Sequence, residues 1–198
     1  QALAFVNKPR FDTRNWQDIH VSVGQRFPVR WINLNQVDSE EDNLRRRGWL
    51  RGAALFARGE GICFQGNSIL FGCTTGGRDS LGQIWRYHAS PDEGTLLETE
   101  RPPELELFLE STSAQRLENP DQFSTTPWGD LMVCEDGKDP QHLVGVTPDG
   151  DCYRFARNSR DPSELAGVCF SPDGTTMFVN NLEAGLTFAV SGPWKKVL

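Results

Sequence analysis

Hydrophobic and polar residues alternate with a period of two in several short runs, most clearly in SILFGC (68–73) and TTMFVNN (175–181). This period is typical of β-strands that bury one face. Gly, Pro, Asn and Asp residues bound the runs and favour tight turns between them. The pattern therefore predicts short strands joined by turns throughout residues 59–198.

The N-terminal part of the chain, residues 1–58, follows this pattern less regularly. Its charged segment Gln36–Arg47 fits either a short helix or a mobile loop, because Ser39 precedes Asp42 as a capping residue would. We expect residues 1–58 to be the end of an earlier structural unit followed by a loop. Residues 59–198 are expected to form the regular part of the fold.

The regular part contains three similar units. Each reads as a strand, a tight turn with a glycine, a second strand, a polar loop and a third strand, and the turn glycines are Gly66, Gly129 and Gly174. Their spacing approaches the roughly 40–45 residues of a four-stranded propeller blade, with Pro91–Ser113 as an inserted loop plus outer strand. The repeat predicts an all-β fold, a β-propeller of three to four blades. A β-sandwich is the alternative, but it does not explain the shared order of elements.

Side-chain alternation also suggests which residues are buried. In the run 68–73, we expect Ile69, Phe71 and Cys73 to face inward and to pack between blades. All five cysteines lie in apolar, strand-like runs, which favours small buried side chains over a disulfide framework; they are Cys63, Cys73, Cys134, Cys152 and Cys169.

Composition and charge exclude several classes of protein. The 198 residues carry a formal net charge of −7 and 24% charged residues. Nucleic-acid binding needs a basic surface, so we expect no nucleic-acid partner. No run of about 18 apolar residues occurs, so we expect no membrane-spanning helix.

Acidic residues recur at equivalent places beside the predicted inner strands. Glu60 lies between two glycines before the first, Asp121 precedes the second unit, and Glu135 and Asp136 follow its second strand. The loops of the inner strands converge on the channel of a propeller. Carboxylates gathered there suit calcium, and iron as a borderline metal. Solvent-exposed turns with incidental acids are the alternative interpretation.

A second candidate is the loop Gly76-Gly77-Arg78, which can bind an anion through backbone N–H groups and a guanidinium. Arg78 is therefore our candidate for substrate binding. The chain has no Ser-His-Asp pattern and no phosphate-binding loop motif, so no catalytic nucleophile is predicted. The three histidines lack metal-like spacing and are expected to be structural.

Several motifs in fixed order resemble those of the PhoX-type alkaline phosphatases, over about Phe56–Trp194. They are GEGICF, FGCTTGG, GQIWRYH, NPDQF, PWGDLMVCEDG, LVGVTPDG, ELAGVCFSPDGTTMFVNN and GPW. The resemblance implies a six-bladed β-propeller that hydrolyses phosphate monoesters with calcium and iron bound near its channel. It makes Glu60 and Glu135 the first candidates for metal ligands, followed by Asp121 and Asp136.

A six-bladed ring needs roughly 270 residues, so the resemblance implies the C-terminal part of the family fold. Exposed blade edges would then favour self-association of the chain. The family is exported, which implies a periplasmic or secreted protein. Two functions stay open: a PhoX-like phosphomonoester hydrolase or its C-terminal part, and a non-catalytic calcium-binding propeller segment that acts as a binding or structural module.

Overall fold

The structure, a computed structural model, describes residues 1–138 and 140–194. Within these residues the fold is all-β, with one α-helix, α1 (Leu44–Leu50), and one 3-10 helix, η1 (Leu96–Thr99). The helix begins inside the charged segment that the sequence left as helix or loop. No helix among the described residues is long and apolar enough to span a membrane.

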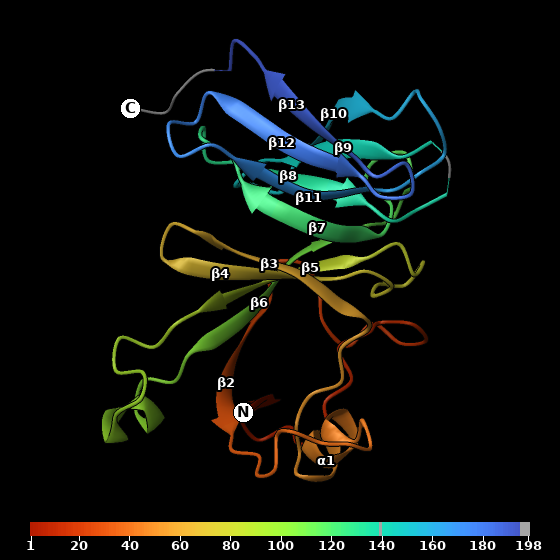
Figure 1. Cartoon of the computed structure of the whole chain (residues 1–198). Coiled ribbons are helices and arrows are strands. Elements are labelled where there is room, and N and C mark those ends of the chain that lie inside the picture. The colour runs from red at the N-terminus through yellow and green to blue at the C-terminus, as the bar shows by residue number, and fades with distance from the viewer. Residues whose placement is uncertain (139, 195–198) are drawn as a thin grey trace.

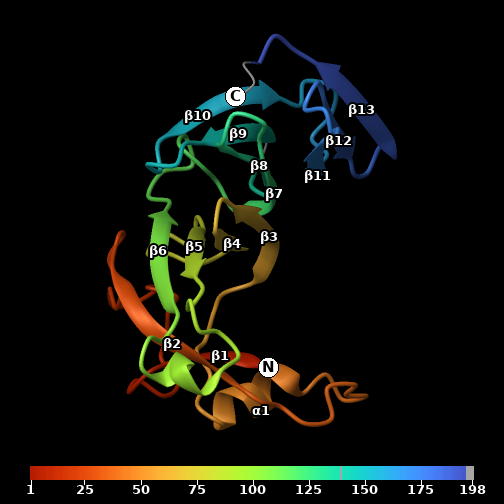
Figure 2. The same cartoon turned by 90° about the vertical axis from the view of Figure 1, so that its left-hand side faces the viewer.

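Three antiparallel sheets are arranged in succession along the molecule (Figure 1). The first sheet has the strand order β1-β2-β6-β5-β4-β3 and curves strongly (Figure 2). Its strands are β1 (Ala2–Phe5), β2 (Arg26–Ile32), β3 (Gly59–Gln65), β4 (Ser68–Cys73), β5 (Gln83–His88) and β6 (Glu104–Glu110).

The second sheet has the order β10-β9-β8-β7, and the third has the order β11-β12-β13. The strands of the second are β7 (Pro120–Thr125), β8 (Leu131–Glu135), β9 (His142–Val146) and β10 (Cys152–Arg157). Those of the third are β11 (Leu165–Phe170), β12 (Thr176–Asn181) and β13 (Leu186–Ser191). The first strands of the three repeats, β3, β7 and β11, are neighbours in space, with β7 in the middle (Figure 1).

The predicted hairpin turns are confirmed. Gly66 and Gly174 adopt φ values of 58° and 68°, the left-handed backbone that glycine accepts without steric cost. The segment Pro91–Ser113 was predicted to be an inserted loop followed by an outer strand, and it contains η1 and the strand β6. The N-terminal segment joins the first sheet, because β2 pairs with β6 and β1 pairs with β2.

The sequence placed Ile69, Phe71 and Cys73 on the inward face of β4 correctly, but the prediction that they pack between blades was wrong. Cys73 is buried, and Ile69 and Phe71 are partly buried, but all three pack against a cluster that includes side chains of the N-terminal segment. Leu70, on the opposite face, packs in the cluster between the first and second sheets. Gly72 shares this face, and its missing side chain leaves room for the ring of Phe123. Alternation identifies residues that share a face, but it does not say which element covers that face.

The cysteines are free, as expected. Cys73 and Cys134 are buried, and burial raises the pKa of each thiol to about 12. Cys63 and Cys152 are half-buried, whereas Cys169 is exposed. The burial predicted for all five therefore fails at Cys169, which lies on β11 in the third sheet.

The three inner strands share a distortion near their beginning. Each has a register shift against its hairpin partner: between Gly59 and Ile62 in β3, between Pro120 and Phe123 in β7, and between Ala166 and Cys169 in β11. A bulge bends a strand and redirects the side chains within it. The repeat thus extends from strand order to a local irregularity at equivalent places.

Close packing of β3 on β7 depends on the second glycine of the GEG motif. A Cβ atom at Gly61 would clash with the carbonyl oxygen of Asp121 and lie 2.9 Å from the Phe123 ring. A Cβ atom at Gly59 would meet nothing within 4 Å. Gly61 therefore serves the approach of the neighbouring strand, and neither residue has a positive φ that would itself require glycine.

We expect Gly61→Ala to lower the free energy of unfolding by about 1–3 kcal/mol, because the added methyl group forces β3 and β7 apart. Gly59→Ala is the matched control and should change it by less than about 0.5 kcal/mol. Urea denaturation of both variants measures the difference. Equal stability of the two variants would contradict the close-packing argument.

Candidate functional site

A cavity of about 650 Å³ opens where the three inner strands begin. Its wall combines residues that are far apart in the sequence but that belong to equivalent parts of the repeats. Four carboxylates line it, from all three sheets: Glu60, Asp121, Asp136 and Glu164. Three of these four were predicted from the sequence, and the structure brings those three to one cavity.

The bulged strands explain this convergence. In the hairpins, Gly59 pairs with Cys73, Pro120 with Glu135, and Leu165 with Asn181, so these pairs are equivalent positions. Residues next to the first member of each pair line the cavity. They are Arg58 and Glu60 from the first repeat, Asp121 from the second, and Glu164 and Ala166 from the third.

Arg58 provides the positive charge in this wall. Its Nη2 atom lies 3.3 Å from Asp136 Oδ2 and 3.7 Å from Glu60 Oε1, so it links acids of the first and second sheets. The residue adopts a φ of 47°, an uncommon backbone conformation for a residue with a side chain. Its carbonyl oxygen accepts a hydrogen bond of 3.0 Å from Thr74 N, which helps to hold that conformation.

Glu164 is the carboxylate most strongly affected by its surroundings. Burial, a side-chain hydrogen bond shared with Asp121 and the negative charge of Asp136 raise its pKa to about 7. The charge of Arg58 opposes this rise. A carboxyl group that resists ionisation beside other acids marks a place where a cation would be stabilised.

Amide side chains complete the third-sheet side of the cavity. Asn181 is fully buried, and its Nδ2 donates to Asp161 Oδ1 at 2.9 Å. Asn180 Oδ1 accepts a hydrogen bond of 2.7 Å from Thr187 Oγ1. Both asparagines line the cavity.

The donor set suits a hard cation. The described lining residues offer carboxylate and amide oxygens but no His or Cys, which is the ligand chemistry of calcium more than of iron. In this conformation, no three His, Cys, Asp or Glu side chains of the described residues converge closely enough to ligate one ion. The cavity is therefore an acidic recess with suitable oxygen donors, and Arg58 lies in its wall.

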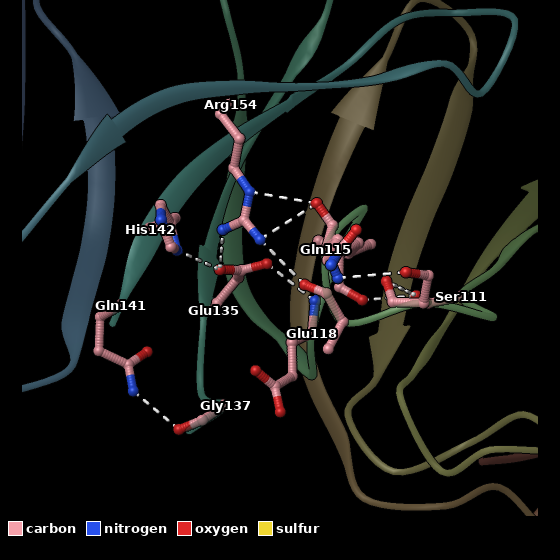
Figure 3. A network of polar contacts seen from close by, with 11 residues as sticks. Ser111, Gln115, Glu118, Glu135, Gly137, Gln141, His142 and Arg154 are labelled. Atoms are coloured by element: carbon pink, nitrogen blue, oxygen red, sulfur yellow. Dashed lines mark hydrogen bonds and ion pairs between the residues drawn. The ribbon is translucent and has the colours of Figure 1, made fainter. Parts of the chain in front are cut away.

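The structure places Glu135 outside the cavity, in a separate polar network (Figure 3). Its side chain is 3% exposed. Glu135 Oε1 accepts from Glu118 N at 2.8 Å, and Oε2 lies 3.1 Å from Arg154 Nη1 and 3.2 Å from His142 Nδ1. Burial raises the pKa of Glu135 to about 7, although the hydrogen bond from Glu118 N and the positive charge of Arg154 both act to lower it. These contacts occupy the carboxylate that the sequence suggested as a metal ligand.

This network positions the connection that enters β7. Arg154 also donates to the carbonyl oxygens of Ala114, at 2.9 Å, and Gln115, at 3.3 Å. Asp136 N donates to Asn119 O at 2.9 Å. The segment before Asp121 and the segment containing Asp136 are therefore joined to each other and anchored to β10.

Arg78 also lies apart from the cavity, at an exposed loop. Its backbone N is 3.4 Å from Glu110 Oε1, and Gly77 N donates to Arg14 O at 2.8 Å. The N–H groups that could have received an anion thus face a carboxylate and a carbonyl of the chain itself. Substrate binding by Arg78 stays a prediction.

Sequence reasoning missed Arg58 and Glu164. The signal was the repeat itself: each of them, like Asn119, directly precedes the first residue of an inner strand. Aligning the units by their turn glycines alone did not reveal this equivalence, because the hairpin loops differ in length: the pairs that close them are Gln65–Ser68, Thr125–Leu131 and Phe170–Met177.

The architecture and the cavity define a class of protein: an all-β protein of packed antiparallel sheets whose inner strands present acidic residues to a common recess. Residues 1–185 match the family described as alkaline phosphatase PhoX. The chain therefore belongs to the PhoX alkaline phosphatase family. No curated protein matches the chain.

We expect Arg154→Met to lower the free energy of unfolding by about 1–3 kcal/mol, because it leaves Glu135 buried without its cation. Adding Glu135→Gln should recover part of this loss, since a neutral amide costs less to bury. Arg157→Met, an exposed position on the same strand, is the control and should change stability by less than about 0.5 kcal/mol. Denaturation of the unaltered chain, both single variants, the double variant and the control tests the pair, and additive losses in the double variant would contradict it.

Proposed function

We propose that this chain is a metal-dependent phosphomonoester hydrolase or the C-terminal part of one. The observation that supports this is the convergence of four carboxylates from three sheets on one cavity, in a member of the PhoX family. Glu60, Asp121, Asp136 and Glu164 are the proposed ligands, with calcium as the cation that fits their oxygen donors best. The family resemblance adds iron.

A bound cation supplies charge that neutralises phosphate oxygens as the phosphoryl group is transferred. The chain itself contributes Arg58, whose guanidinium group can donate two hydrogen bonds to a phosphate. In the structure, this group lies 3.7 Å from Glu60 and 3.3 Å from Asp136. We propose that Arg58 would bind and orient a phosphate monoester at this side of the cavity.

The proposal extends to architecture and location. Three successive sheets with adjacent inner strands are compatible with consecutive blades of a six-bladed propeller around the cavity. A periplasmic or secreted location follows from the family. The alternative is a non-catalytic propeller segment that binds calcium for structure, and the all-oxygen donor set is the observation that favours it.

Calcium binding measured by calorimetry tests the cavity directly. We expect Glu164→Gln and Asp121→Asn each to weaken binding about tenfold or more, because each removes a charged ligand. Glu40→Gln, which removes an exposed acid outside the cavity, should leave the affinity unchanged. Equal affinities in all variants, or no binding, would overturn the metal-site proposal.

Glu164→Gln should at the same time raise the melting temperature of the cation-free protein. The carboxyl group is crowded by Asp121 and Asp136, and a neutral side chain of the same shape removes that repulsion. Calcium should stabilise the unaltered chain more than this variant. A lower melting temperature for the cation-free variant would show that Glu164 is not electrostatically strained.

Hydrolysis of p-nitrophenyl phosphate by the chain supplied with calcium and iron tests the activity. We expect Arg58→Gln to lower kcat/KM by about 10- to 100-fold, the effect of losing a charged hydrogen-bond donor, and Arg58→Lys to lower it less. Both variants should retain calcium binding. Calcium-dependent stabilisation without any turnover in the unaltered chain would favour the non-catalytic alternative.

A further inference from the structure

Asn119 stands in the second repeat at the place that Arg58 and Glu164 hold in the other two, directly before an inner strand. Arg58 and Glu164 line the acidic cavity, whereas Asn119 is not among its described lining residues. Asn119 and Arg58 share an uncommon backbone conformation, with φ values of 49° and 47°. The second repeat therefore has a neutral amide at a position where the other two repeats have a charged group.

The amide of Asn119 reaches across to the first sheet. Its Nδ2 atom donates to Thr74 O at 2.7 Å and to Ser80 O at 3.0 Å, and its backbone N donates to Leu81 O at 2.8 Å. These three acceptors lie in the connection between β4 and β5. One residue thus attaches the start of β7 to both ends of a connection in the neighbouring sheet.

These hydrogen bonds complete a closed ring of four residues, Arg58, Thr74, Asn119 and Asp136. Thr74 N donates to Arg58 O at 3.0 Å, and Asp136 N donates to Asn119 O at 2.9 Å. Arg58 Nη2, 3.3 Å from Asp136 Oδ2, closes the ring at the cavity wall. Thr74 is fully buried, so its carbonyl oxygen depends on a donor from the chain rather than from solvent.

We infer that Asn119 is a positioning residue of the acidic cavity, which sets the placement of Arg58 relative to Asp136 through this ring. The inference rests on the proposed function, because it takes a cation to be the ligand of the cavity. Residues that orient metal ligands without touching the ion commonly change the affinity by about 10- to 100-fold. Since Asn119 does not line the cavity, its replacement removes no oxygen donor from the cation site.

A merely structural role would lower the stability of the chain without changing the calcium affinity of the folded protein. Asn15 provides the matched comparison. It has a φ of 56°, its Nδ2 donates to Val21 O at 2.8 Å, and it belongs neither to the ring nor to the cavity wall. Glycine accepts a positive φ at both positions, so an Asn→Gly change removes the side-chain hydrogen bonds without straining the backbone.

Calorimetry of calcium binding, at a temperature where all the proteins are folded, separates the two roles. We expect Asn119→Gly to weaken calcium binding about tenfold, because Arg58 and Asp136 lose their common support. Asn15→Gly should lower the melting temperature and leave the calcium affinity unchanged. An unchanged affinity in Asn119→Gly, or the same loss in both variants, would overturn the inference.

Amide hydrogen exchange in the calcium-free chain tests the ring without any metal. Relative to the amides of β12, we expect those of Thr74 and Asp136 to exchange about tenfold faster in Asn119→Gly and at an unchanged rate in Asn15→Gly. Unchanged exchange of both amides in Asn119→Gly would overturn the inference even in a chain that binds calcium. The expected exchange in a chain that binds no calcium would contradict the proposed metal site and still support the positioning of Arg58 and Asp136 by Asn119.

Discussion

The close approach of β3 to β7 at Gly61 is the constraint on which the cavity depends. The absence of a side chain there lets the carbonyl oxygen of Asp121 and the ring of Phe123 lie directly against β3. Glu60 and Asp121, each next to this contact in the chain, consequently face one recess. The bulges at the start of each inner strand redirect their side chains, and the glycine permits the spacing. The contact at Gly61 therefore sets both the packing of the two strands and the position of the two acidic residues.

Two carboxyl groups with raised pKa values, Glu135 in the second repeat and Glu164 in the third, differ in how their charge is compensated. Glu135 is enclosed and receives Arg154 and the Glu118 N–H, so its contacts are complete within the chain. Glu164 shares a hydrogen bond with another acid, and Arg58 only partly offsets the crowding. Unfavourable electrostatics of this kind are typical of functional sites, which supports the proposed role of the recess between the sheets.

Much of this arrangement could be read from the sequence. The strands, the glycine turns and the repeat followed from local patterns, and three of the four cavity acids followed from their places beside inner strands. Two aspects could not. The period of two identified the face of Ile69 but not the N-terminal strands that cover it. Of the adjacent acids Glu135 and Asp136, only the packing of Arg154 decides that the first is enclosed and the second faces the cavity.

The third sheet connects the cavity to the molecular edge. Leu186 and Thr187 belong both to the wall of the acidic recess and to the exposed strand β13. The wall from the first and second sheets is packed between neighbouring sheets, whereas this part lies on β13, which pairs only with β12 among the strands of residues 1–138 and 140–194. Edge strands with few neighbours open more readily than central strands. The side of the cavity that β13 forms therefore has the least support from neighbouring strands, whereas the sides formed by Glu60 and Asp121 are packed against each other at Gly61.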